Sequence, residues 1–124
     1  MRGGAVGRAR ELLALLAALG LAALLAGGPV AGQERELILA RGQQLFLDGG
    51  CLICHAVRGN GGTAGPDLTE VGNRYDEAAL GRWMRDPTRH KVAVHTQKFE
   101  AMTDGKVQAL AAYLASLRGE GPPR

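Results

Sequence analysis

The first apolar feature of the chain is the stretch "LLALLAALGLAALLAGGPV", residues 12–30, which has no polar face. Arg2, Arg8 and Arg10 precede it, and small residues follow it as far as Gly32. A positive start, an apolar middle and a small-residue exit are typical of an export signal. We therefore predict that residues 1–32 are a signal peptide cleaved after about Gly32. The alternative is a retained membrane anchor, because the stretch approaches membrane-spanning length.

After this leader, apolar residues recur at helical spacing in three segments, residues 34–47, 77–85 and 103–117. In the first segment, one stripe holds Leu37, Ala40, Gln44 and Leu47, with Leu45 and Phe46 beside it. The apolar face of the second segment consists of Leu80, Trp83 and Met84, and that of the third consists of Val107, Leu110, Ala111, Leu114 and Leu117. Spacings of three and four residues place such side chains on one face of a helix. The pattern predicts an all-α domain over residues 33–120.

Helix boundaries follow from capping and breaking residues. Gly49 and Gly50 end the first helix, Asp76 caps the second, Pro87 stops it, and Thr103 caps the third. Short polar side chains suit the first position of a helix, and proline ends one because it disfavours helical geometry in the residue before it.

Two connections separate these helices. Residues 57–73 are rich in Gly, and we expect a long functional loop anchored by Pro66, Leu68 and Val71. Residues 88–99 lack a clear helical period, and we expect an extended loop there. Residues 121–124, with two prolines, are expected to be a disordered tail.

The charge balance changes once the leader is set apart. The chain of 124 residues has a formal net charge of +3, but three Arg and one Glu lie in residues 1–32. The remaining 12 basic and 11 acidic residues leave a net charge of +1. Nucleic-acid binding needs a concentrated basic face, so this function is not expected. A domain this small with few aromatic residues often needs a cofactor or another staple to complete its core.

The two cysteines of the chain, Cys51 and Cys54, lie in the sequence "CLICH" together with His55. A thioredoxin-like redox pair would require a preceding strand, which the pattern does not predict. A structural zinc site would need two more ligands, and only His90 and His95 offer themselves. Covalent haem attachment uses two thiols at this spacing and coordinates the iron through the adjacent imidazole. The motif therefore indicates one covalently bound haem c.

The ordered set of motifs resembles the class I c-type cytochromes, a family of small single-haem electron carriers. The matching segments are "GQQLF" at 42–46, "CLICH" at 51–55, "GPDL" at 65–68, "NRY" at 73–75, "LGRWMRDP" at 80–87 and "LAAYLASL" at 110–117. They extend over nearly all of residues 33–120. The resemblance implies the cytochrome c fold, with three to four helices wrapped round one haem.

The resemblance also implies roles for single residues. Gly42 and Phe46 would meet the last helix near Leu110 and Tyr113. The Pro66 carbonyl would accept a hydrogen bond from Nδ1 of His55 and so orient the ring. Arg74 and Trp83 would bind the haem propionates, although Trp83 is equally suited to core packing and Arg74 to an ordinary surface position.

The sixth iron ligand is the point where the chain departs from the family. The family supplies a methionine in a Met-Pro-x-Phe segment, which is absent here. Counting back from the last helix through Phe99 places that ligand at Thr96, and His95 beside it is a good ligand. His95 is therefore the expected sixth ligand.

Met102 is the alternative ligand. It directly precedes the capping residue Thr103, however, and Val107 follows at the fourth helical position. Met102 and Val107 would then form a hydrophobic staple, which would hold Met102 away from the iron. Met84 and His90 are weaker candidates.

The resemblance implies a carrier of single electrons, not an enzyme, whose partners are redox proteins. The leader predicts that this carrier is exported and is either periplasmic or membrane-anchored. One alternative is a haem c subunit of a larger oxidoreductase or respiratory complex, and another is a five-coordinate ligand-binding haem protein. A basic group near the second helix would form either a docking rim or a solvated face. This group comprises Arg82, Arg85, Arg89, Lys91 and Lys98.

Overall fold

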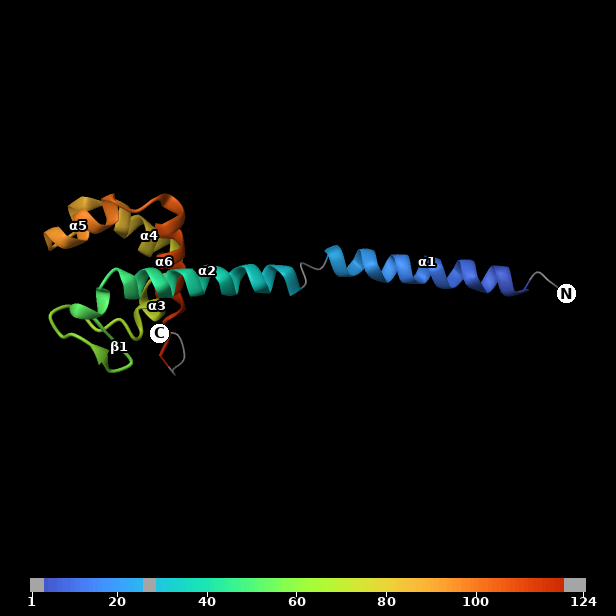
Figure 1. The fold of residues 1–124 in the computed structure, drawn as a ribbon, viewed down its shortest axis with the longest axis horizontal. Helices are drawn as coiled ribbons and strands as arrows, with labels where there is room; N and C mark the ends of the chain where they lie inside the picture. Colours follow the sequence, from blue (N-terminus) through green and yellow to red (C-terminus); the bar gives the residue numbers. More distant parts are fainter. Residues whose placement is uncertain (1–3, 26–28, 120–124) are drawn as a thin grey trace. The chain divides into compact units, whose positions relative to one another are not determined.

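The computed structural model describes residues 4–25 and 29–119 (Figure 1). The chain divides into two units, residues 1–35 and residues 36–124. The described residues form six α-helices and a two-stranded antiparallel sheet, which confirms the predicted all-α class. The tail expected to be disordered, residues 121–124, lies outside the described residues.

The first unit contains helix α1, Gly4–Leu25, and the beginning of helix α2, Pro29–Asp48. The leucines of α1 between residues 12 and 21 are 60–68% exposed. No helix in the described part of the chain combines the length and the apolar character needed to cross a bilayer. Cleavage of a signal peptide or retention of an anchor stays a prediction.

The three predicted helices are confirmed in α2, in α4, Glu77–Arg85, and in α6, Asp104–Ser116. Helix α2 begins five residues earlier than expected. The carboxylate of Asp76 caps α4 by accepting a hydrogen bond from the backbone N of Ala79 at 2.7 Å. Thr103 occupies the capping position of α6, but its side chain makes no capping hydrogen bond.

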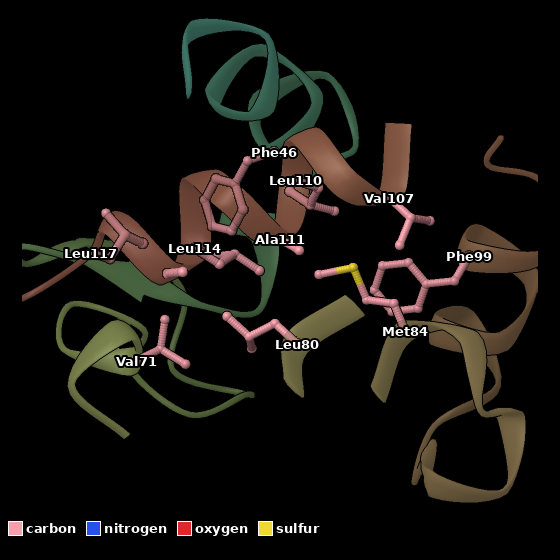
Figure 2. Packing of buried hydrophobic residues seen from close by; sticks show 11 residues of the cluster. Phe46, Val71, Leu80, Met84, Phe99, Val107, Leu110, Ala111, Leu114 and Leu117 are labelled. Atoms are coloured by element: carbon pink, nitrogen blue, oxygen red, sulfur yellow. The ribbon is translucent and has the colours of Figure 1, made fainter. Parts of the chain in front are cut away.

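Helix α6 supplies most of the buried apolar side chains (Figure 2). Phe46 of α2, together with Leu80 and Met84 of α4, packs into the same cluster. Gly42 allows α2 to approach α6, because a Cβ there would overlap the carbonyl oxygen of Ala109 and lie 2.6 Å from the Cβ of Tyr113. The contact that the resemblance implied between the helix of Gly42, α2, and the last helix, α6, is therefore present.

The long connection is more ordered than the sequence suggested. It starts with a hairpin, in which β1, Ala56–Val57, pairs with β2, Asn60–Gly61. It ends in the single-turn helix α3, Val71–Arg74. The backbone N of Gly72 donates to the carbonyl of Leu117 at 2.9 Å, which ties α3 to the end of α6.

The expectation of an extended loop over residues 88–99 is wrong. The segment contains a 3₁₀ turn, η2, Pro87–Arg89, and helix α5, Ala93–Glu100. Only Phe99 of α5 is buried, so a single apolar anchor leaves no periodic stripe in the sequence. Helix α5 is held instead by tertiary bonds: Arg85 of α4 donates to the carbonyls of Phe99 and Met102, and Lys98 donates to the carbonyl of Gly49.

Candidate haem-binding site

Both cysteines and the adjacent histidine lie in one tight turn after α2. The left-handed backbone of Gly50, with φ 66°, leads into the 3₁₀ turn η1, Cys51–Ile53. The backbone N of His55 then donates to the carbonyl of Cys51 at 2.9 Å. The two thiols are free and half-buried, so they are available for covalent attachment. Burial raises the pKa of the Cys51 thiol, and the nearby Lys98 ammonium partly opposes this effect.

The imidazole of His55 is oriented by Pro66. Its Nδ1 lies 2.7 Å from the Pro66 carbonyl oxygen, which can only accept, so Nδ1 carries the proton. This leaves Nε2 as the nitrogen available to a metal. It is the hydrogen bond that the resemblance implied, and the role of His55 as a ligand remains a prediction.

The loop that carries Pro66 is tied to the cysteine turn by backbone bonds. The N of Gly65 donates to the Cys54 carbonyl at 2.6 Å, and the N of Leu68 donates to the Ala56 carbonyl at 2.9 Å. Gly65 also packs directly against His55, because a Cβ there would lie 2.6 Å from Cε1 and 2.7 Å from Nδ1 of the ring. The sequence places Gly65 in the matching segment "GPDL" but predicted no role for it, although its place directly before Pro66 could have indicated one.

His95, the expected sixth ligand, faces His55. The two ring centroids lie 5.9 Å apart, and the ring planes are inclined by only 15°. Two imidazoles on opposite sides of one metal, each at about 2 Å from it, have centroids roughly 6 Å apart. The centroid separation of His55 and His95 therefore matches that of two imidazoles bound to one metal, and the role of His95 as a ligand remains a prediction.

The surroundings of His95 favour a neutral ring. Burial lowers the pKa of His95, and its neighbours His55, His90 and Lys98 lower it further. Neutral imidazole is the form that coordinates metals. Within residues 29–119, the structure gives the ring nitrogens of His95 no hydrogen-bond partner.

The other ligand candidates occupy different environments. Both ring nitrogens of His90 are hydrogen-bonded, to the Trp83 carbonyl and to the Thr96 hydroxyl. Met84 is buried in the apolar core, with 2% exposure (Figure 2). Met102 packs against the same core, and its carbonyl accepts a hydrogen bond from Arg85.

The two residues expected at the haem propionates lie in unlike places. Trp83 is half-buried, with its ring centroid 4.9 Å from that of His90, 5.4 Å from that of His95 and 5.8 Å from that of Phe99. Arg74 is exposed at the end of α3, with its guanidinium carbon 5.9 Å from the centre of the Tyr75 ring. Trp83 thus lies beside the histidine pair, and propionate binding by either residue stays a prediction.

The residues present fit a covalently attached haem. Two free thiols, an oriented imidazole and a second imidazole facing it provide both the attachment points and two nitrogen donors. Apolar and aromatic side chains adjoin them: Leu52, Trp83 and Phe99 all belong to the core cluster or pack against it.

Comparisons with known proteins agree with this geometry. Residues 39–118 match the family model described as cytochrome c. The chain is also 34% identical over 94 residues to cytochrome c oxidase subunit 2 of Alkalihalophilus pseudofirmus, a match that covers 69% of this chain. The chain spans only 28% of the length of that relative. No solved structure gives a significant match.

The family match covers more than half of the chain and includes the cysteine turn, the Pro66 loop and helices α4 to α6. Haem-based electron transfer with redox partner proteins follows from this match. The chain therefore belongs to the cytochrome c family, as a class I c-type cytochrome with covalently attached haem c.

Proposed function

We propose that this protein is an exported monohaem carrier of single electrons whose iron is held between His55 and His95. The observation that carries this proposal is the near-parallel approach of the two imidazoles, at 5.9 Å and 15°. When bound, the haem supplies an iron that alternates between the ferrous and ferric states, and its axial ligands tune the potential. A second imidazole gives a lower potential than a methionine would.

The residues around the two histidines orient the rings and shield them from water. Pro66 fixes the tautomer and direction of the His55 ring through its carbonyl. Phe99, which is 7% exposed, lies with its ring centroid 5.8 Å from that of His95 and keeps water from that side. Such fixed ligands in a partly desolvated pocket suit electron transfer, in which no substrate bond is made or broken. The proposal therefore assigns no catalytic residue.

Ligand substitution tests the axial pair. We expect the purified protein to be low-spin in both oxidation states, without the near-infrared band that the family resemblance associates with methionine ligation. The variant His95→Ala should lose the low-spin spectrum, and the matched variant Met102→Ala should keep it. The opposite result would assign the sixth ligand to Met102. A parent protein that is already high-spin would support the five-coordinate alternative.

A second function is favoured by one comparison. The relative from Alkalihalophilus pseudofirmus is named as a subunit of cytochrome c oxidase, and this chain matches 28% of its length. We therefore propose, as the alternative function, a haem subunit that stays bound to a larger oxidoreductase. Affinity purification from membranes distinguishes the free carrier from the complex subunit. A free carrier elutes alone, whereas a complex subunit elutes with partner chains in fixed ratio.

The leader supports an extracytoplasmic location, which we propose to be the periplasm. Residues 1–32 have the basic start and apolar stretch of an export signal. The intact mass of the protein from fractionated cells tests this. A soluble protein that begins near Gln33 indicates cleavage, and a membrane-bound chain that still carries residues 12–30 indicates an anchor.

The sequence left open whether five basic residues form a docking rim or a solvated face, and we propose that two of them serve as the rim. Three of its five members have internal partners: Arg85 pairs with Asp104, Arg89 pairs with Asp86, and Lys98 donates to the Gly49 carbonyl. Arg82 and Lys91 are exposed and remain the members best suited to steer a partner. Their replacement by glutamine should slow electron transfer most at low ionic strength.

A further inference from the structure

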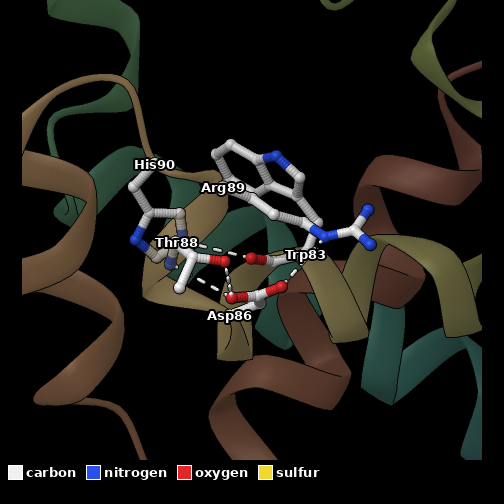
Figure 3. Close-up of polar contacts among 5 residues, drawn as sticks. All are labelled: Trp83, Asp86, Thr88, Arg89 and His90. Carbon is white, nitrogen blue, oxygen red and sulfur yellow. Dashed lines mark hydrogen bonds and ion pairs between the residues drawn. The ribbon is translucent and has the colours of Figure 1, made fainter.

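A compact polar turn joins α4 to α5 (Figure 3). The carboxylate of Asp86 accepts hydrogen bonds from the backbone N of Thr88 at 3.1 Å, from the Thr88 hydroxyl, and from Nε of Arg89 at 3.0 Å. The backbone N of His90 then donates to the Pro87 carbonyl at 3.2 Å. Asp86 thus shapes the η2 turn and places His90 directly after it.

The ring of His90 is bonded at both nitrogens. Nε2 lies 3.1 Å from the carbonyl oxygen of Trp83, which can only accept, so Nε2 is the protonated nitrogen. Nδ1 then carries a lone pair and accepts from the Thr96 hydroxyl, 3.1 Å away. Both ring nitrogens of His90 are therefore engaged in hydrogen bonds, which leaves neither of them free for a metal.

These two bonds connect different helices. Trp83 lies in α4, and Thr96 lies in α5 directly after His95. The His90 ring also packs against Trp83 and Phe99, with centroid distances of 4.9 and 5.4 Å. A rotation or shift of α5 that moved His95 away from His55 would break the Thr96 bond and disturb this packing.

We infer that His90 is a positioning residue, which holds α5 through Thr96 so that the His95 imidazole stays opposite His55. The inference rests on the proposed role of His95 as the sixth ligand. It also assigns different tasks to the two histidines of the segment: His95 binds the iron, and His90 binds the helix that carries His95.

Competition with an added ligand tests this. We would measure ferric cyanide binding to the purified holoprotein, because cyanide must displace the sixth ligand. The variant Thr96→Val keeps the side-chain shape and removes the hydroxyl. The variant His90→Phe keeps a ring against Trp83 and removes both hydrogen bonds. The variant Glu100→Gln, at an exposed position of the same helix, is the matched control.

The expected result follows from the strength of a neutral hydrogen bond. Loss of one bond should tighten apparent cyanide binding by about 3- to 10-fold in Thr96→Val. His90→Phe should show at least that effect, and the control should stay within about 2-fold of the parent. The double variant should match His90→Phe alone, because both changes break the same bond between residues 90 and 96. Without cyanide, all variants should remain low-spin.

The experiments distinguish a wrong role for His90 from a wrong role for His95. If His95→Ala loses the low-spin spectrum while Thr96→Val and His90→Phe bind cyanide like the parent, the role of His90 is wrong and the role of His95 stands. If His90→Phe becomes high-spin while His95→Ala stays low-spin, His90 is the ligand and both proposals are wrong. If His90→Phe does not yield holoprotein, the Thr96→Val measurement decides alone.

Discussion

Gly65 packs directly against the imidazole ring of His55, so that any side chain at position 65 would collide with the ring. A Cβ at position 65 would lie 2.6 Å from Cε1 of His55, a separation that real Cβ contacts do not reach. The same residue donates its backbone N to the Cys54 carbonyl. The close packing of the Pro66 loop against His55 therefore requires a residue without a side chain at position 65.

Gly65→Ala should consequently displace the His55 ring or the Pro66 carbonyl. We expect less holoprotein and a ferric spectrum shifted toward high spin, measured on protein matured in the same cells as the parent. Gly81→Ala is the control, because a Cβ there meets nothing within 4 Å. It should leave the spectrum unchanged and stabilise α4 by about 0.5–1 kcal/mol. Identical spectra for both variants would contradict the tight contact at Gly65.

Gly42→Ala should destabilise the crossing of α2 and α6. The added methyl would overlap the Ala109 carbonyl, a backbone atom that moves only with its helix. Overpacking of this kind costs about 1–3 kcal/mol. Urea unfolding of the holoprotein measures it, with Gly105→Ala as control, since a Cβ at Gly105 has open space. A loss in Gly42→Ala no larger than that of the control would show that the helices separate easily.

Replacing both thiols tests the attachment of the cofactor. The variant Cys51→Ala/Cys54→Ala should yield protein whose haem, where present, is fully extracted by acidified acetone. The parent and the variant Ser116→Ala should keep their colour under the same treatment. Colour retained by the doubly substituted chain would rule out thioether attachment at these positions.

Arg85 should contribute to stability through two carbonyl groups more than through its ion pair. Its guanidinium donates to the carbonyls of Phe99 and Met102 and pairs with Asp104, whose side chain is 99% exposed. Arg85→Met should cost about 1.5–3 kcal/mol, because bonds from a charged donor are lost. Asp104→Asn should cost less than about 1 kcal/mol, as exposed ion pairs do. Equal losses in denaturant unfolding would assign the effect to the ion pair.

Asp67 gives the Pro66 loop an acid sensitivity. Hydrogen bonds from the side chain and backbone of Thr69 lower the pKa of Asp67 below its ordinary value of 3.8. The folded state therefore favours the carboxylate, and stability present above pH 3.8 is lost as the pH falls through the lower folded value. Asp67→Asn keeps an acceptor for the 2.7 Å bond from the Thr69 N and should flatten this part of the acid-unfolding profile. Glu100→Gln controls for the removal of one surface carboxylate, and an unchanged profile in Asp67→Asn would contradict the prediction.

Local sequence patterns were sufficient to predict the helices that have a repeated apolar face. Helix α6 has seven buried residues and α4 has an acidic cap, so spacing and capping located both. The pentapeptide from Cys51 to His55 indicated the cofactor, because the two thiols and the imidazole expected to hold a haem lie within one turn. The Pro66 hydrogen bond was expected only through the resemblance, since it joins residues eleven apart in the chain.

Helix α5 and the arrangement of its histidines depend on contacts that no local window contains. Its residues present one buried side chain, and its position is set by Arg85, Lys98 and His90 through bonds to distant backbone or side-chain atoms. From the amino-acid order alone, His90 and His95 were both possible ligands. Packing of α5 against α4 gives the two rings different surroundings: the ring of His95 lies beside that of His55, whereas both nitrogens of His90 are hydrogen-bonded to neighbouring residues.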